Sequence, residues 1–137
     1  MTTGKKNFSV GDYNLPALYN GNCNVAVGTD CLCQNNGGSN NVAIGTGAGS
    51  GVIGDDTICI GSQTGFYPKN SFSRSTCIGY QSTITASDQF NIGNPSTSVK
   101  ISGSLDVSGN ILLLGNLICN SSTITNQSLF QYTDSAG

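Results

Sequence analysis

A five-residue unit recurs along residues 20–97, and it restricts the possible folds more than any other feature of the chain. The unit reads polar, apolar or β-branched, small, Val or Ile, Gly. Its copies are residues 24–28, 41–45, 57–61, 75–79 and 89–93. The closing glycines of successive copies lie 17, 16, 18 and 14 residues apart. A repeat of this period predicts an array of stacked structural units.

Each unit alternates as a β-strand does, because its second and fourth residues point to one face and its third residue to the other. A strand this short cannot bury a face alone, so consecutive copies must stack on one another. Stacking at about 4.8 Å per coil predicts a parallel β-solenoid, in which the Gly ends each strand. We expect the larger residues to face its interior. This predicted core column consists of Val25, Val27, Val42, Ile44, Ile58, Ile60, Ile78, Phe90 and Ile92.

The third residue of every unit is small and uncharged. We expect this column to face outward, where small side chains would allow a second backbone to approach closely. We therefore predict that the column forms the interface of a homotrimer, with an exposed sheet face that has no partner as the alternative. The predicted trimer interface consists of Ala26, Ala43, Cys59, Cys77 and Asn91.

The composition favours an all-β fold and opposes most catalytic chemistry. The 137 residues include 19 Gly, no His and no Trp, and all seven acidic residues are Asp. Residues that build helix surfaces are scarce, and the commonest general bases and metal ligands are missing. We therefore predict a protein that is not an enzyme and that has no cofactor and no metal site. A glycan-cleaving protein with paired Asp residues across a groove is the one enzymatic alternative.

The charge and the cysteine positions indicate which partners to expect, and the absence of long apolar segments indicates where the protein is made. The net charge of −2 opposes nucleic-acid binding, which needs clustered Lys and Arg. No apolar stretch is long enough for a membrane helix, and no apolar segment follows the first residues, so we expect synthesis in a cytosol without membrane insertion. Cys31 and Cys33 form a C-x-C pair without a second pair or a His, which does not match a zinc site. Cys59 and Cys77 are expected to act as small hydrophobic residues.

Two further segments resemble functional sites in their residues, but the structural context that such sites require is not predicted there. Residues 49–54 read G-x-G-x-x-G, but another strand of the repeat follows them where a nucleotide site needs a helix, so we interpret them as a Gly-rich turn. Asp55 and Asp56 are adjacent, and their carboxylates diverge in an extended chain. We expect solvated turn residues there, with a Ca²⁺ ion shared between subunits as the alternative.

A different pattern begins after Pro95. Apolar residues occupy alternate positions over residues 99–119, and a Gly recurs every six residues, at Gly103, Gly109 and Gly115. Short strands of this kind leave apolar faces and open edges in a single chain, which three intertwined chains would cover. We therefore divide the chain into an N-terminal cap (1–19), a head with the five units (20–97), a β-shaft (98–119) and a C-terminal tail or last strand (120–137).

The unit Asn41-Val42-Ala43-Ile44-Gly45 and its relatives resemble the head repeat of YadA-type trimeric autotransporter adhesins, a repeat that also occurs in phage and large-virus fibre proteins. The resemblance covers residues 20–97 and implies a left-handed parallel β-roll in a homotrimer with a role in adhesion. Residues 101–116 resemble the Gly-hexad stretches of viral and phage fibre shafts, which implies an intertwined trimeric β-prism. Irregular repeat lengths, and Cys at the small position of two units, depart from the bacterial pattern.

The longest connection between two units, from Gly61 to Gly79, concentrates aromatic and positively charged residues. Loops on rigid scaffolds carry binding residues, and aromatic and Arg side chains dominate binding hot spots. We predict a receptor- or glycan-binding loop here, with aromatics that cover the roll or pack in the trimer as the alternative. The predicted loop residues are Phe66, Tyr67, Lys69, Phe72 and Arg74.

Together the two patterns predict a non-enzymatic, homotrimeric fibre or spike component of a virion, which displays loops for host-surface binding. The expected partners are a host-surface glycan or receptor and other virion proteins. The expected location is the virion, with exposure at its surface after assembly. The alternatives are a minor capsid or cementing protein that binds only other virion proteins, and a bacterial trimeric adhesin head.

Overall fold

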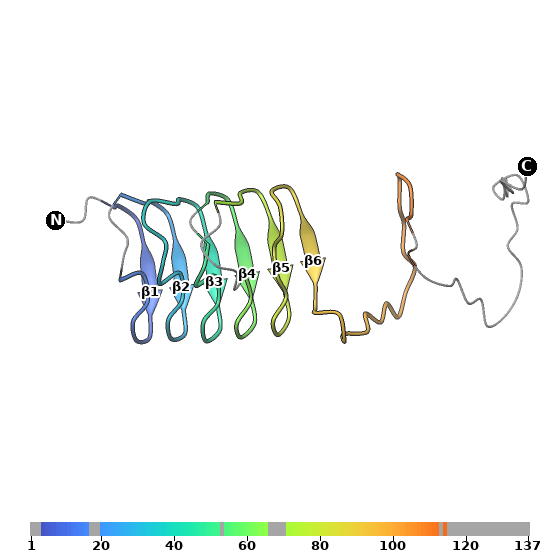
Figure 1. The fold of residues 1–137 in the computed structure, drawn as a ribbon, viewed down its shortest axis with the longest axis horizontal. Helices are drawn as coiled ribbons and strands as arrows, with labels where there is room; N and C mark the ends of the chain where they lie inside the picture. Colours follow the sequence, from blue (N-terminus) through green and yellow to red (C-terminus); the bar gives the residue numbers. More distant parts are fainter. Residues whose placement is uncertain (1–3, 17–19, 53, 66–70, 113, 115–137) are drawn as a thin grey trace, which may run out of the picture. The chain divides into compact units, whose positions relative to one another are not determined.

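Six short parallel strands form one sheet in the first of two compact units. The computed structural model describes residues 4–16, 20–52, 54–65, 71–112 and 114, which contain no helix. The chain divides into residues 1–100 and residues 101–137. The strands stack in chain order, each parallel to the next (Figure 1). They are β1 (Phe8–Val10), β2 (Val25–Val27), β3 (Val42–Ile44), β4 (Ile58–Ile60), β5 (Thr76–Ile78) and β6 (Phe90–Ile92).

The prediction of an all-β parallel solenoid is confirmed. The five predicted units supply β2 to β6, and neighbouring strands pair in register, so that Cys59 lies opposite Cys77. Figure 1 shows one strand per coil, with a narrow turn after each strand. Backbone bonds connect the coils at equivalent positions; Val25 N, for example, donates to Asn41 O at 2.8 Å. Each coil therefore satisfies the backbone of the next without a helix.

The closing glycine of each unit is required by its own backbone and by the neighbouring coil. Gly45 has a φ of +120°, and a Cβ built there would lie 2.7 Å from the carbonyl carbon of Gly61. Gly28 has a φ of +139° and would meet Gly45 in the same way, at 2.9 Å. An L-residue would combine a strained φ with a backbone clash. The glycines thus form a column that lets the coils stack closely.

Residues with left-handed backbone conformation bend the chain at both ends of the strands. The leading turn column, which precedes the strands, has φ values of 54° to 62° and consists of Lys6, Cys23, Asn40, Asp56, Arg74 and Asp88. The trailing turn column, which follows them, has φ values of 52° to 67° and consists of Tyr13, Asp30, Gly47, Gln63 and Gln81. Backbone bonds hold both columns from coil to coil, as in the 2.8 Å bond from Gln63 N to Thr46 O.

The small column faces the interior, so its predicted role as a trimer interface is wrong. Ala26, Ala43, Cys59 and Cys77 are at most 1% exposed and belong to the hydrophobic core. The last member, Asn91, is half-buried, and its Nδ2 donates to Thr83 O at 2.8 Å within the same coil. A side chain enclosed by its own coil is not accessible to a second chain.

The larger column correspondingly lies on the outside of the sheet. Its members are half-buried or exposed, with Ile44 at 40% and Phe90 at 67%. The prediction of an interior position is therefore wrong for Val25, Val27, Val42, Ile44, Ile58, Ile60, Ile78, Phe90 and Ile92.

The width of the coil explains the inversion. The wall opposite the strands lies so close that a Cβ built at Gly49 would be 3.5 Å from Ala43 Cβ, and one at Gly65 would be 2.7 Å from Cys59 Sγ. Only small strand residues fit in this space. Hydrophobicity alone would bring Val and Ile inside, but the larger interior side chains come from outside β2–β6. They are Leu32, Val52 and Ile84, each 1% exposed.

Buried asparagines link the backbones of successive coils. Asn24 Oδ1 accepts from Asn41 N (3.0 Å), and Asn24 Nδ2 donates to Gly38 O (2.9 Å). Asn41 repeats the pattern one coil later, with Thr57 N (2.9 Å) and Gly54 O (2.8 Å). The polar first residue of these units is therefore a buried bridge between coils, which explains why a polar side chain is compatible with that position.

The N-terminal segment contains a strand that lies outside the five predicted units. Phe8 of β1 pairs with Val25 of β2. Residues 7–11, Asn-Phe-Ser-Val-Gly, fit the five-residue unit, and Asn7 Oδ1 accepts from Asn24 N at 2.9 Å as in the later coils. The solenoid thus begins within the segment predicted as a cap (1–19).

The described part of the second unit, residues 101–112 and 114, contains no strand, and its side chains are exposed. Leu112 is 81% exposed, for example, and Leu114 is 95% exposed. The predicted shaft (98–119) requires three chains and stays a prediction. The predicted tail or last strand (120–137) lies outside the described residues.

Candidate interaction surface

The outward residues of the strands form what we call the outer apolar face. Each strand contributes its first and third residue, and in-register pairing aligns these positions along the sheet. The exposed fractions of Ile58, Ile60 and Ile92 are 38%, 37% and 43%. Its members are Phe8, Val10, Val25, Val27, Val42, Ile44, Ile58, Ile60, Thr76, Ile78, Phe90 and Ile92. Because folded monomers rarely expose an extended apolar patch, this face is a candidate interaction surface.

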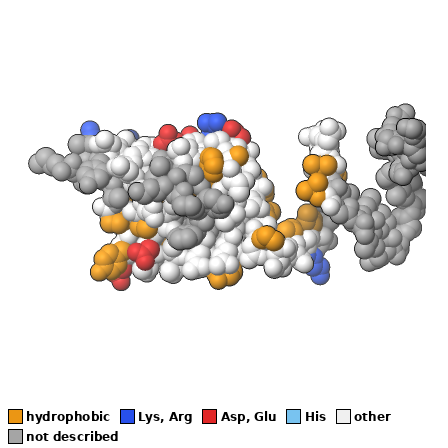
Figure 2. Space-filling model, viewed as in Figure 1, with side chains coloured by type: hydrophobic (Ala, Val, Ile, Leu, Met, Phe, Trp, Pro, Cys, Tyr) orange, Lys and Arg blue, Asp and Glu red, His pale blue; other side chains and the backbone are white. Residues whose placement is uncertain are grey.

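The outer apolar face contains no ionisable side chain and only one polar one, that of Thr76. In the view of Figure 2, the Lys, Arg and Asp side chains of the first unit that can be seen lie near its upper and lower borders. Charged residues are depleted at the centre of protein interfaces, because their desolvation is costly. The composition of the outer apolar face therefore suits burial against another protein.

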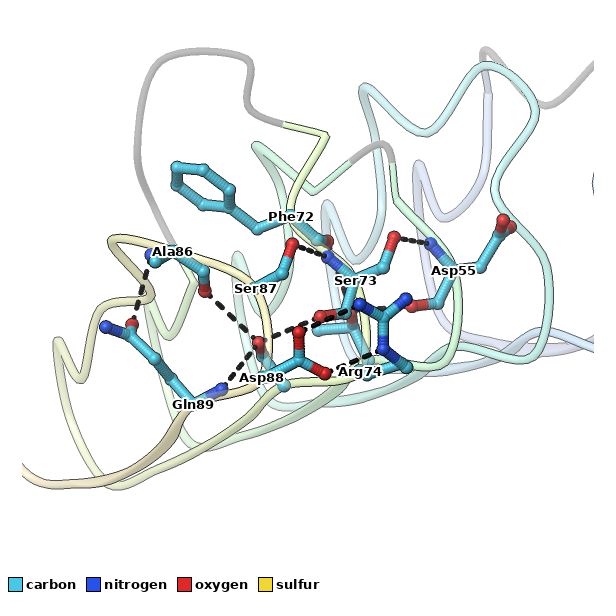
Figure 3. A network of polar contacts seen from close by, with 10 residues as sticks. Asp55, Phe72, Ser73, Arg74, Ala86, Ser87, Asp88 and Gln89 are labelled. Carbon is cyan, nitrogen blue, oxygen red and sulfur yellow. Dashed lines mark hydrogen bonds and ion pairs between the residues drawn. The ribbon is translucent and has the colours of Figure 1, made fainter.

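Side chain to backbone hydrogen bonds hold the turn before the strands (Figure 3). Ser73 Oγ accepts from Asp55 N at 3.0 Å, and Ser87 Oγ accepts from Ser73 N at 3.1 Å. The carboxylate of Asp55 accepts in turn from Ser39 N at 2.7 Å. Asp56, which follows Asp55, accepts from Asn40 Nδ2 at 3.1 Å. These polar residues therefore have a structural role in joining coils.

Arg74 and Asp88 form a bidentate ion pair on the leading turn column. The distance is 2.7 Å from Nε to Oδ1 and 2.8 Å from Nη2 to Oδ2. The hydrogen bond from Arg74 holds the pKa of Asp88 below its ordinary value, and the bond to Asp88 raises the pKa of Arg74. Both side chains are more than 60% exposed, so water screens the pair and its contribution to stability is small.

The structure describes two of the five residues predicted for a receptor-binding loop, and their surroundings differ. Phe72 is half-buried and packs against the hydrophobic core, as the alternative of an aromatic that covers the roll predicted. Arg74 is exposed and bound to Asp88. Phe66, Tyr67 and Lys69 lie outside the described residues, so the binding role of this loop stays a prediction.

Two thiols of the small column meet inside the solenoid. The Sγ atoms of Cys59 and Cys77 lie 3.2 Å apart, and both residues are at most 1% exposed, which agrees with their expected role as small hydrophobic residues. The hydrogen bond with Cys77 and burial raise the pKa of Cys59 far above its ordinary value. Among the described residues, no group of three His, Cys, Asp or Glu side chains could hold a metal ion.

No protein-family model, curated protein or solved structure matches the chain. The described part of the chain also has no helix of the length and apolarity needed to cross a membrane.

Sequence reasoning missed the outer apolar face, although the units carry a signal for it. Their third residue is never larger than Asn91, which is what a narrow interior requires, whereas the second and fourth residues vary in size from Thr76 to Phe90. Constant small size marks an enclosed position more reliably than hydrophobicity does, because hydrophobic residues also occupy much of a protein surface.

Proposed function

We propose that the chain is a homotrimeric structural component of a virion fibre or spike, which displays its turns and loops for host-surface binding. The observation that supports this most directly is the outer apolar face, which extends over six strands without an ionisable side chain. A surface of this kind, exposed in one chain, is expected to be covered in the working assembly.

Identical copies suit this face better than an unrelated partner. Every strand presents the same pair of positions, so three copies would meet with matching side chains at matching heights. Closed symmetric assembly of one chain is the usual form of soluble oligomers. Around a threefold axis, the outer apolar faces would be buried and both turn columns would stay accessible.

The second unit fits the same assembly. Its described apolar residues are exposed in a single chain, as with Leu105 at 66% and Ile111 at 63%. In this proposal the first unit is a left-handed β-roll and residues 98–119 form an intertwined β-shaft, in which two further chains cover these side chains. The combination of a head-like repeat with a Gly-hexad segment in one chain supports a virion component.

Native mass tests the proposal. We expect light scattering coupled to size exclusion to give the mass of three chains, independent of concentration. Ile60→Asp puts a charge at the centre of the outer apolar face and should give the mass of one chain with an unchanged sheet spectrum. Gln81→Asp puts the same charge on the trailing turn column and should leave the mass of three chains. A single-chain mass for the natural sequence, or a trimeric Ile60→Asp variant, would contradict the proposal.

A further inference from the structure

The sequence contains two Asn-Gly pairs, Asn20-Gly21 and Asn36-Gly37. In such a pair the backbone nitrogen of the Gly can attack the amide carbon of the Asn side chain and close a five-membered ring. Gly favours this reaction because it has no side chain that would hinder the ring and because its backbone is conformationally free. In a folded protein, the reaction also requires that the surrounding structure leaves the pair free to move. The two pairs of this chain differ in that respect.

The pair Asn36-Gly37 is exposed and unbound. Both residues are exposed, and within the described part of the chain neither the Asn36 amide nor the backbone N–H of Gly37 has a hydrogen-bond partner. A Cβ built at Gly37 would meet no atom of the described residues within 4 Å. The two reacting groups are therefore open to water, and no neighbouring coil restrains them.

The pair Asn20-Gly21 is bound into the solenoid. Gly21 is buried, and its carbonyl oxygen accepts from Asn7 Nδ2 at 2.9 Å, as one of the amide bridges between coils. On the other side of the pair's peptide bond, Asn20 O accepts from Asn22 Nδ2 at 3.1 Å. Ring closure turns the backbone around this peptide bond, so it would break these contacts. We therefore expect the fold to protect Asn20 and to leave Asn36 reactive.

Two buried residues that one side chain joins flank the exposed pair. Asn35 is 0% exposed; its Oδ1 accepts from Gly38 N at 2.7 Å, and its Nδ2 donates to Gly38 O at 3.1 Å. Gly38 is buried as well, and its carbonyl oxygen also accepts the bridge from Asn24 Nδ2 at 2.9 Å. The backbone of the exposed pair thus spans a distance that these bonds set. A change in its length would act on a bridge between coils.

We propose that Asn36 is a site of spontaneous deamidation in the folded protein, with water as the only co-reactant. Gly37 N loses its proton to hydroxide and forms a bond to Asn36 Cγ; the bond from Cγ to Nδ2 breaks, and Nδ2 takes a proton from water and leaves as ammonia. Water then opens the cyclic imide. Opening at Cγ gives aspartate, and opening at the backbone carbonyl carbon gives isoaspartate. The sum of the steps is one water consumed and one ammonia released, without oxidation or reduction.

The two products differ in their effect on the solenoid. Aspartate adds one negative charge at an exposed position and leaves the backbone unchanged. Isoaspartate adds the same charge but passes the chain through Cβ and Cγ, which lengthens the backbone between Asn35 and Gly38 by one carbon atom. This lengthening should weaken the bonds of Asn35 and the bridge from Asn24. The site lies outside the outer apolar face, so the reaction does not depend on the proposed trimer.

The test is an incubation of the full chain, folded and in denaturant, at neutral and at mildly alkaline pH. Peptide mapping by mass spectrometry measures the conversion at each pair, and methylation by an isoaspartate methyltransferase identifies the isoaspartate product. In the folded protein we expect conversion at Asn36 to be about tenfold faster than at Asn20, or more, and to accelerate with pH. In denaturant the two rates should become similar, because both pairs are then equally free.

Gly37→Ala is the variant that separates the reaction from folding. The φ of Gly37 lies outside the left-handed region and the space around it is open, so an Ala should fit without strain. Its side chain hinders ring closure. We therefore expect an unchanged denaturation midpoint and conversion at Asn36 that is slower by about tenfold or more.

Asn36→Asp is the control for the charge, since it carries the carboxylate without the additional backbone carbon. It should keep the midpoint of the fresh protein, whereas the aged protein, which contains isoaspartate, should unfold at lower denaturant. Gly37→Ala aged in parallel should keep its midpoint, which excludes damage elsewhere in the chain.

Three outcomes would overturn the inference. The first is an Asn36 that stays intact in the folded protein but converts in denaturant. The second is equal conversion of Asn20 and Asn36 in the folded protein, which would show that the fold does not select the site. The third is an unchanged rate at Asn36 in Gly37→Ala, which would exclude attack by the backbone nitrogen of residue 37. An unchanged midpoint of the aged protein would contradict the effect assigned to the backbone between Asn35 and Gly38.

Discussion

Both units of the chain contain regularly spaced glycines, but among the described residues only those of the first unit form a sheet. Glycines of the first unit recur every 14 to 18 residues and pack on the next coil, as Gly45 does on Gly61. Gly103 and Gly109 of the second unit recur every six residues, and a Cβ built at either would meet no atom of the described residues within 4 Å.

Repeat length explains this difference. A coil of about 16 residues can return to the start of the previous strand, so that the chain pairs with itself. Six extended residues span about 20 Å and cannot make such a return. A short Gly repeat therefore cannot pair with itself coil by coil, whereas a long one can.

We expect the largest loss of stability from a substitution in the glycine column of the first unit. Gly45→Ala should destabilise the protein by at least about 3 kcal/mol, because it adds a clash with Gly61 to a strained φ. Gly103→Ala in the second unit is the matched control and should leave the transition unchanged. Denaturant unfolding followed by circular dichroism measures both. Equal effects of the two substitutions would contradict the distinction between the units.

A smaller loss is expected where the buried amide bridges join the coils. Asn41→Ala leaves Thr57 N and Gly54 O without their side-chain partner, which should cost about 2 kcal/mol. Asn110→Ala, at an exposed position in the second unit, should cost nothing measurable. Denaturant titration measures the free energy of unfolding of both variants. If Asn41→Ala left this free energy unchanged, the amide bridges would not be needed for stability.

The buried thiols predict a fall in stability at high pH. The hydrogen bond with Cys77 and burial raise the pKa of Cys59 above the ordinary 9.0, so the folded state keeps a proton that the unfolded state loses. The contribution of Cys59 is therefore complete below pH 9 and should be lost at about 1.4 kcal/mol per pH unit above it, in addition to the loss from Cys31 and Cys33, whose pKa values burial also raises. Denaturant midpoints measured from pH 8 to pH 10.5 should show this slope, and Cys59→Ala should reduce it. A flat profile would mean that the thiol is not enclosed.

The sequence predicted the strands because their period of two and their closing Gly are local properties. It did not predict which face is enclosed, because alternation separates Ala43 from Ile44 without saying which side the chain closes on. That depends on how near the opposite wall lies, at Gly49 and Gly65.

The smallest effect is expected at the exposed ion pair on the leading turn column. Arg74→Gln removes the bidentate partner of Asp88, so the pKa of that carboxyl should return towards its ordinary value. Arg74→Lys keeps the charge without the paired geometry and should retain only part of the lowering, since the side-chain hydrogen bond is its main cause. Carboxyl NMR titration measures the pKa, and denaturant unfolding at neutral pH should give the same midpoint for all three proteins.

Comparing Arg74→Gln with Asn41→Ala distinguishes an exposed contact on the coil surface from a buried contact between coils. The lowered pKa of Asp88 favours the folded state fully above the pKa of an unfolded Asp and ceases to do so as the pH falls through its folded pKa, and exposure to water makes the contribution small. If Arg74→Gln nevertheless lowered the midpoint as much as Asn41→Ala, this exposed ion pair would join the coils as strongly as a buried amide bridge does.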